Sequence, residues 1–120
     1  ITVDCPTAVA LGTWVKKGLK PAVGRPGVAE LQIAAHNACR TRNSIPGAPV
    51  SEHGRGRAVD ISAVVLGNGA VLDVLADYGS RAGKALRVAY KAACGIFGTT
   101  LGPGSDGYHE NNLHLDTARY

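Results

Sequence analysis

The feature that most constrains the fold is a pair of apolar runs separated by a tight turn. The first run, residues 58–66, is rich in β-branched side chains, and the second covers residues 70–75. Between them stands Gly67-Asn68-Gly69, and glycine and asparagine tolerate the positive φ angles that short hairpin turns require. The segment therefore predicts a β-hairpin, with Asp60 near the start of its first strand.

The rest of the chain alternates between helical and extended patterns. Apolar residues recur at helical spacing in residues 6–17, with Asp4 or Thr7 as the cap and Gly18 as the stop, and again in residues 80–94, which Gly95 closes. Extended segments are predicted at residues 29–35, 96–101 and 113–116, a glycine- and proline-rich linker at 21–27, and a loop at 40–50.

This order of elements predicts one α+β domain over residues 1–120. A chain of 120 residues can bury one core, and the hairpin favours a small antiparallel sheet with helices packed on one side. The sequence contains no apolar stretch of about 18 residues, so we expect no membrane span. The chain starts at Ile1 without a methionine or a leader pattern, and we expect it to be a mature or trimmed piece.

The chain has a small excess of basic over acidic residues. The formal net charge is +4 and the pI is about 9.2, but the lysines and arginines are dispersed and are not interleaved with aromatic residues. That distribution argues against a nucleic-acid partner. A basic surface of this kind would suit an anionic polymer such as a bacterial cell wall.

The cysteines are three in number, Cys5, Cys39 and Cys94, and no Cys-x-x-Cys pair occurs. We expect one disulfide among them and hence an extracytoplasmic location, periplasmic or secreted. The alternative is three buried free thiols in a cytosolic protein.

Three residues have the chemistry of an open zinc site. His53 and Asp60 stand seven positions apart, and His114 follows far downstream in Leu113-His114-Leu115-Asp116. Zn²⁺ binds nitrogen and oxygen donors in a tetrahedron, and a catalytic site keeps three protein ligands and one water. We expect the three side chains to converge on the face of the sheet if the terminal strand lies beside the hairpin.

The residues around this set resemble a known family. Ser51, His53, Gly56, Ala58 and Asp60 match a Ser-x-His-x-x-Gly-x-Ala-x-Asp pattern, which resembles the zinc peptidases of the lysostaphin, D-Ala-D-Ala peptidase and hedgehog-like fold. More closely, the chain is similar to the bacterial extensin-like C-terminal domain. That closer resemblance rests on Cys39-Arg40-Thr41-Arg42-Asn43, Leu101-Gly102-Pro103 and Leu113-His114-Leu115-Asp116, and it spans the chain from Cys5 to Asp116.

The resemblance implies a metallopeptidase that acts on peptidoglycan or its stem peptides, and we expect the chain to be a monomer. In it His53, Asp60 and His114 would hold Zn²⁺, which polarises a water against a peptide carbonyl. Arg40 falls where related peptidases carry an arginine, and its guanidinium would bind the tetrahedral oxyanion or a substrate carboxylate. Ser51 would orient the metal loop through hydrogen bonds.

The chain departs from the family pattern at the general base. Active relatives carry Asp, Glu or His two or three residues before the last zinc histidine, but here those positions hold Asn112 and Asn111. An amide has no useful basicity near neutral pH, which leaves His109 or Glu110 as substitutes. Three interpretations follow: a natural pseudo-enzyme, an enzyme with a relocated base, or an inactivated variant.

Two other functions stay open beside the hydrolase. One is a cell-wall binding module that keeps the fold and has lost the base. The other is a secreted interaction domain, like the hedgehog relatives, in which zinc serves structure or partner binding.

Overall fold

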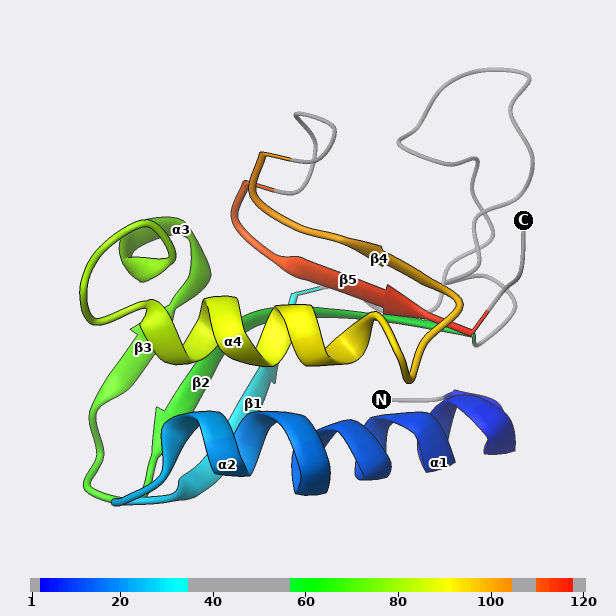
Figure 1. The fold of residues 1–120 in the computed structure, drawn as a ribbon, viewed down its shortest axis with the longest axis horizontal. Coiled ribbons are helices and arrows are strands. Elements are labelled where there is room, and N and C mark those ends of the chain that lie inside the picture. Colours follow the sequence, from blue (N-terminus) through cyan, green and yellow to red (C-terminus); the bar gives the residue numbers. More distant parts are fainter. Residues whose placement is uncertain (1–2, 35–56, 105–109, 118–120) are drawn as a thin grey trace.

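Strand β2 (Ala58–Leu66) forms the centre of a five-stranded antiparallel sheet (Figure 1). The computed structural model describes residues 3–34, 57–104 and 110–117. Strand β1 (Val28–Ile33) pairs with one edge of β2, and β5 (Leu113–Asp116) and β3 (Val71–Asp73) pair in succession with the other. Strand β4 (Thr99–Leu101) pairs with the outer edge of β5. The predicted α+β fold with a small antiparallel sheet is confirmed.

The predicted hairpin is present, with a second strand shorter than expected. Its first strand has the predicted bounds, 58–66, and Asn68 closes the turn by accepting a hydrogen bond from the backbone N–H of Ala70 at 3.0 Å. The second strand ends at Asp73, whose carboxylate accepts a hydrogen bond from Ala76 N at 2.9 Å and so caps the short helix α3 (Val74–Asp77). Residues 74 and 75 are therefore helical, because the cap competes successfully with strand pairing.

A bulge at Ser62 decides which side chains of β2 face the core. Gln32 of β1 pairs with Ala63 and Ile33 pairs with Ile61, so Ser62 is an extra residue on β2. An extra residue reverses the alternation of side chains beyond it. Ile61 before the bulge and Val64 after it can both join the core, although their spacing is odd. Asp60 lies between the core residues Val59 and Ile61 and therefore points to the opposite face.

The first helix runs further than predicted. Helix α1 (Cys5–Trp14) continues through a π-helical turn (Val15–Leu19) into α2 (Lys20–Val23), and the helix ends at Gly24, where φ is 66°. Asp4 is the cap, since its carboxylate accepts a hydrogen bond from Thr7 N at 2.9 Å. The expected stop at Gly18 and the start of the linker at residue 21 are therefore wrong.

Gly18 serves helix packing. A Cβ at this position would lie 3.0 Å from Trp14 Cδ1 and 3.1 Å from Ala92 Cβ, so the missing side chain lets the first helix approach α4 (Lys84–Ala93) closely. Trp14 is fully buried at this contact, and its indole N–H donates to the carbonyl of Ala89 at 2.7 Å.

Helix α4 begins four residues later than predicted. A Cβ at Gly83 would lie 1.8 Å from the carbonyl oxygen of Asp77, so the turn before the helix requires glycine there. Arg87 reaches back from the helix and donates hydrogen bonds to the carbonyls of Tyr78 and Ser80. The end of the helix agrees with the prediction, because its C-cap is Cys94, next to Gly95.

The core lies between the helices and one face of the sheet (Figure 1). Buried residues from the first helix, β2, α3, α4, the turn after α4 and β5 form one cluster: Trp14, Leu19, Val59, Ile61, Val64, Val74, Leu86, Ala89, Ala93, Phe97, Leu113 and Leu115. Leu113 and Leu115 alternate with His114 and Asp116, so the sheet has an apolar face toward the helices and a polar face away from them.

The remaining strand predictions agree with the structure within a few residues. Strand β1 covers most of the expected 29–35, β4 covers only the end of the expected 96–101, and β5 has the predicted bounds. The predicted loop at 40–50 lies outside the described residues. Within the described ranges, no helix is long and apolar enough to cross a membrane.

Of the expected disulfide pairings, only Cys5 with Cys94 lies within the described residues, and these two cysteines are not joined. Cys5 in the first turn of α1 and Cys94 at the end of α4 both carry free thiols and are exposed. Cys39 lies outside the described residues.

The role of Gly18 can be tested against Gly12 in the same helix. At Gly12 an added Cβ meets nothing within 4 Å, so Gly12→Ala should raise the free energy of unfolding by about 0.5–1 kcal/mol through helix propensity. The free energy of unfolding of Gly18→Ala should be about 1–3 kcal/mol lower than that of Gly12→Ala, because the added methyl group overpacks the helix contact. Urea denaturation measures both. Equal gains for the two variants would show that Gly18 is not a packing position.

Candidate functional site

The antiparallel pairing of β2 with β5 brings two of the predicted zinc ligands together. Asp60 and His114 are direct partners in the register, and their side chains lie on the same face of the sheet. His114 Nδ1 lies 2.8 Å from Asp60 Oδ1. Asp60 is 7% exposed and His114 9%, so water competes little for this contact.

Asp116 completes the cluster from the other side of the imidazole. It stands two residues after His114 on β5, and its Oδ2 lies 2.7 Å from His114 Nε2. Asp116 is fully buried, and its backbone carbonyl accepts a hydrogen bond from Gly98 N at 2.9 Å. The imidazole is thus held at both nitrogens by carboxylates that the sheet fixes in place.

The two carboxylates control the pKa of His114. Burial by itself lowers this pKa, but the hydrogen bonds that the ring donates to Asp116 and Asp60, together with the negative charges of these residues, outweigh burial and raise the pKa from 6.5 to about 9. In the metal-free protein, His114 is therefore an imidazolium at neutral pH. It donates one N–H to each aspartate and compensates part of their buried charge.

The same donors suit a zinc ion. Two ligands bound to one Zn²⁺ at about 2.0–2.1 Å in a tetrahedron lie roughly 3.4 Å apart. The 2.8 Å between Asp60 Oδ1 and His114 Nδ1 would have to open by about 0.6 Å to reach that separation. A zinc-bound histidine usually donates its other N–H to a carboxylate, and Asp116 stands at that nitrogen. The cluster therefore fits two ligands and one orienting carboxylate.

The other predicted site residues are only partly within the described structure. His53, Arg40, His109 and Ser51 lie outside the described residues. Within the described ranges, no group of three His, Cys, Asp or Glu side chains is arranged to hold a metal ion.

The carboxylate of Glu110, one of the two candidate bases, is hydrogen-bonded to the backbone of Gly104. Glu110 is exposed in the turn before β5, and its Oε1 accepts a hydrogen bond from the backbone N–H of Gly104 at 2.9 Å. Asp60, His114 and Asp116 are all buried.

The sequence reasoning undervalued Asp116. The sequence motif assigned Asp116 no part in the site, whereas the structure places its carboxylate 2.7 Å from Nε2 of the His114 imidazole. The signal was the alternation in Leu113-His114-Leu115-Asp116, which puts the two polar side chains on one face of any strand that buries the leucines.

Comparison with known proteins gives one match. The family model described as "Extensin-like protein C-terminus" matches residues 1–120, the whole chain. Neither the curated proteins nor the solved structures gave a match.

The charge state of His114 makes the stability of the metal-free protein depend on pH. Because its pKa is higher in the folded protein, at about 9, than in the unfolded chain, at about 6.5, the cluster contributes its full stability below pH 6.5. That contribution falls as pH rises through 9. Asp116→Asn should lower the His114 pKa, which NMR titration of the imidazole reports. A wild-type pKa near 6.5 would contradict this assignment.

Proposed function

We propose that this chain, which belongs to the Extensin-like protein C-terminus family, is a zinc-dependent hydrolase of peptide bonds in bacterial peptidoglycan. The observation that carries the proposal is the convergence of Asp60 and His114 on neighbouring strands, in one buried cluster. They stand more than fifty residues apart in sequence, and both belong to the ligand set that the sequence motif indicates.

In this proposal the metal ligands are Asp60, His114 and His53. Zinc, when bound, would acidify a water and polarise a peptide carbonyl. Asp116 fixes the orientation of the His114 ring by accepting a hydrogen bond from Nε2, which leaves Nδ1 for the metal. Arg40 would bind the oxyanion or a substrate carboxylate through its guanidinium.

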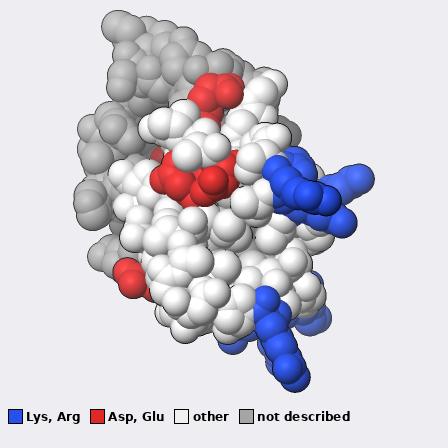
Figure 2. Space-filling view, turned by 90° about the vertical axis from the view of Figure 1, so that its left-hand side faces the viewer, with Lys and Arg blue, Asp and Glu red and all other residues white. Residues whose placement is uncertain are grey.

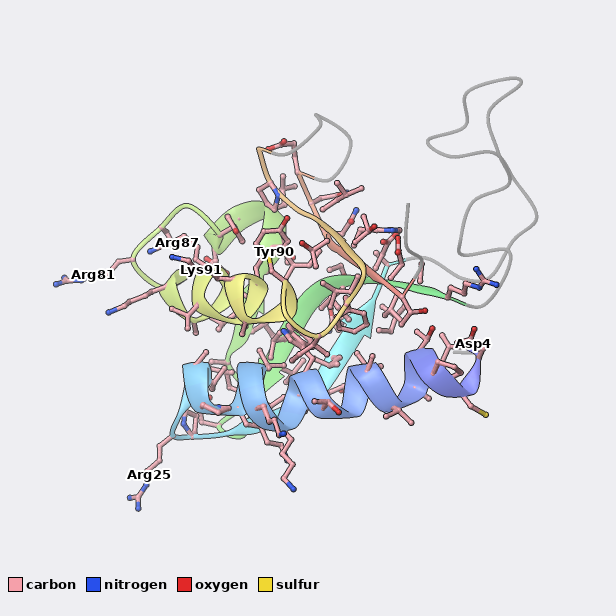
Figure 3. The ribbon with its side chains drawn as sticks, turned by 45° about the vertical axis from the view of Figure 1, so that its right-hand side comes forward. Asp4, Arg25, Arg81, Arg87, Tyr90 and Lys91 are labelled. Carbon is pink, nitrogen blue, oxygen red and sulfur yellow. The ribbon has the colours of Figure 1, made fainter. Side chains whose placement is uncertain are left out.

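The surface of the helices supports an anionic polymer as the partner. No aspartate or glutamate occurs within residues 5–23 or 84–93. Exposed cations lie on or beside these helices: Lys16, Lys17, Lys20, Arg25, Arg81, Lys84 and Lys91. Figure 2 shows lysines and arginines lying apart from the acidic side chains, and Arg25 and Arg81 extend away from the fold in Figure 3. Peptidoglycan and the polymers attached to it are anionic, so we also propose an extracytoplasmic location.

A second candidate function is a cell-wall binding module that retains the metal. The observation that favours it is the pair Asn111 and Asn112 where relatives carry a base. An amide cannot take a proton from a water, and Glu110 is exposed with its carboxylate on Gly104 N. His109 is the remaining candidate base.

Metal binding is the first test of both candidates. The purified protein should hold about one zinc per chain, and Asp60→Ala or His114→Ala should remove it. Asp116→Asn should weaken zinc affinity about 10- to 100-fold, because the ring loses its orienting carboxylate. Elemental analysis and competition with a chromophoric chelator measure both effects. Glu30→Gln, on the exposed part of β1, is the matched control and should leave affinity unchanged. Zinc retained in full by Asp60→Ala would remove Asp60 from the ligand set.

Turnover distinguishes the hydrolase from the binding module. Zinc-loaded protein incubated with muropeptides should release cleaved stem peptides, and both a chelator and Asp60→Ala should stop the release while Glu30→Gln does not. Mass spectrometry of the products measures it. Sedimentation of the protein with intact sacculi, without any cleavage, would reject the hydrolase in favour of the module.

A further inference from the structure

Asn112 is buried with one polar atom unsatisfied. It lies immediately before β5 and is 9% exposed. Its Nδ2 donates to Asn111 Oδ1 at 2.9 Å, but its own Oδ1 has no hydrogen-bond partner in the described part of the chain. Most buried carbonyl oxygens in proteins are hydrogen-bonded, since desolvation without a partner is costly. An orphaned buried acceptor next to a candidate site calls for a donor.

The alternation of side chains places Asn112 on the face of the sheet that carries Asp60, His114 and Asp116. Leu113 and Leu115 join the core, and His114 lies between them on the opposite face. Because side chains alternate along an extended chain, Asn112 belongs to the same face as His114. The two residues are separated along the strand by only about 7 Å between Cα atoms.

In the described part of the chain, neither β5 nor β3 extends its pairing with β2 to the level of Asn112. Strand β5 pairs with β2 as far as Leu113 opposite Ile61, and β3 begins to pair with Asp73 opposite Ala63. Asn112 therefore lies at the level of Ser62, in the junction between two strands that follow one another along the same edge of β2. Ser62 itself directs its hydroxyl to the carbonyl of Gln32 on β1.

We propose that Asn112 Oδ1 accepts a hydrogen bond from a backbone N–H of a peptide bound at the cluster of Asp60, His114 and Asp116. This inference rests on the proposed function and deepens it, because it gives a specific task to a residue that occupies the usual position of a base. A carboxamide oxygen accepts a hydrogen bond from an amide N–H without taking its proton. A site built around such an acceptor selects an amide over an ester, since the ester lacks the donor and leaves the buried oxygen unpaired.

The test compares a peptide with its esters. The probe is N-acetyl-L-lysyl-D-alanyl-D-alanine, with analogues in which each amide N–H is replaced in turn by oxygen. NMR titration of the zinc-loaded chain reports binding and any cleavage products together. In the wild type, one of the esters should bind at least tenfold more weakly than the amide. Asn112→Leu, which is similar in size and has no acceptor, should bind that ester and the amide equally.

Two controls separate binding from folding. Asn111→Asp keeps an oxygen that can accept from Asn112 Nδ2, and it should preserve the tenfold discrimination. Metal-free Asn112→Leu should have an unfolding midpoint equal to or above that of the wild type, because it removes an unpaired polar atom.

Each contrary result has a distinct meaning. Equal wild-type binding of the amide and every ester, or discrimination that survives Asn112→Leu, would overturn this inference and leave the proposed function standing. A marked loss of stability in Asn112→Leu would make the residue structural and also overturn it. A zinc-loaded wild type that binds none of the probes would overturn the proposed function and this inference with it.

Discussion

The register between β2 and β5 is the constraint on which the site depends. It places Asp60 directly opposite His114, and a slip of one residue would turn one of them toward the helices and into the core. The same register buries Val59, Ile61, Leu113 and Leu115, so hydrophobic packing and the polar cluster select the same pairing. The bulge at Ser62 lets β2 satisfy both demands, because it restores the core face for Val64 without moving Asp60.

The two negative charges of the polar cluster can be offset in part by a proton on His114 or, under the proposed function, by a zinc ion. Two buried carboxylates repel one another and lose hydration, and a positive charge between them is required to offset that cost. In the metal-free protein this positive charge is that of the doubly protonated His114 imidazole. Its two N–H groups each donate a hydrogen bond to one aspartate. A zinc ion would bind the same lone pair of His114 and the same oxygen of Asp60, so the proton and the metal compete. Metal binding to this site should therefore release protons.

Much of this arrangement follows from the sequence by elementary rules. The bounds of β2 and β5 and the polar face of β5 could be predicted, because β-branched content and strict alternation are local signals. The pairing of Asp60 with His114 could be predicted only as far as the two strands were expected to be neighbours. Gly18 could not be assigned correctly, since glycine stops an isolated helix but here accommodates Trp14 and α4. Asp73 ended its strand early through a capping bond that no hydrophobic pattern reveals. The roles of Arg40, His53 and His109 remain sequence predictions.

The most direct test of the account is anomalous X-ray scattering at the zinc absorption edge from crystals of the zinc-loaded protein. If zinc binds as proposed, one anomalous peak lies within bonding distance of Asp60 and His114 Nδ1, with Asp116 still hydrogen-bonded to Nε2. A peak elsewhere, or none with His114 still held between the two carboxylates, would contradict it.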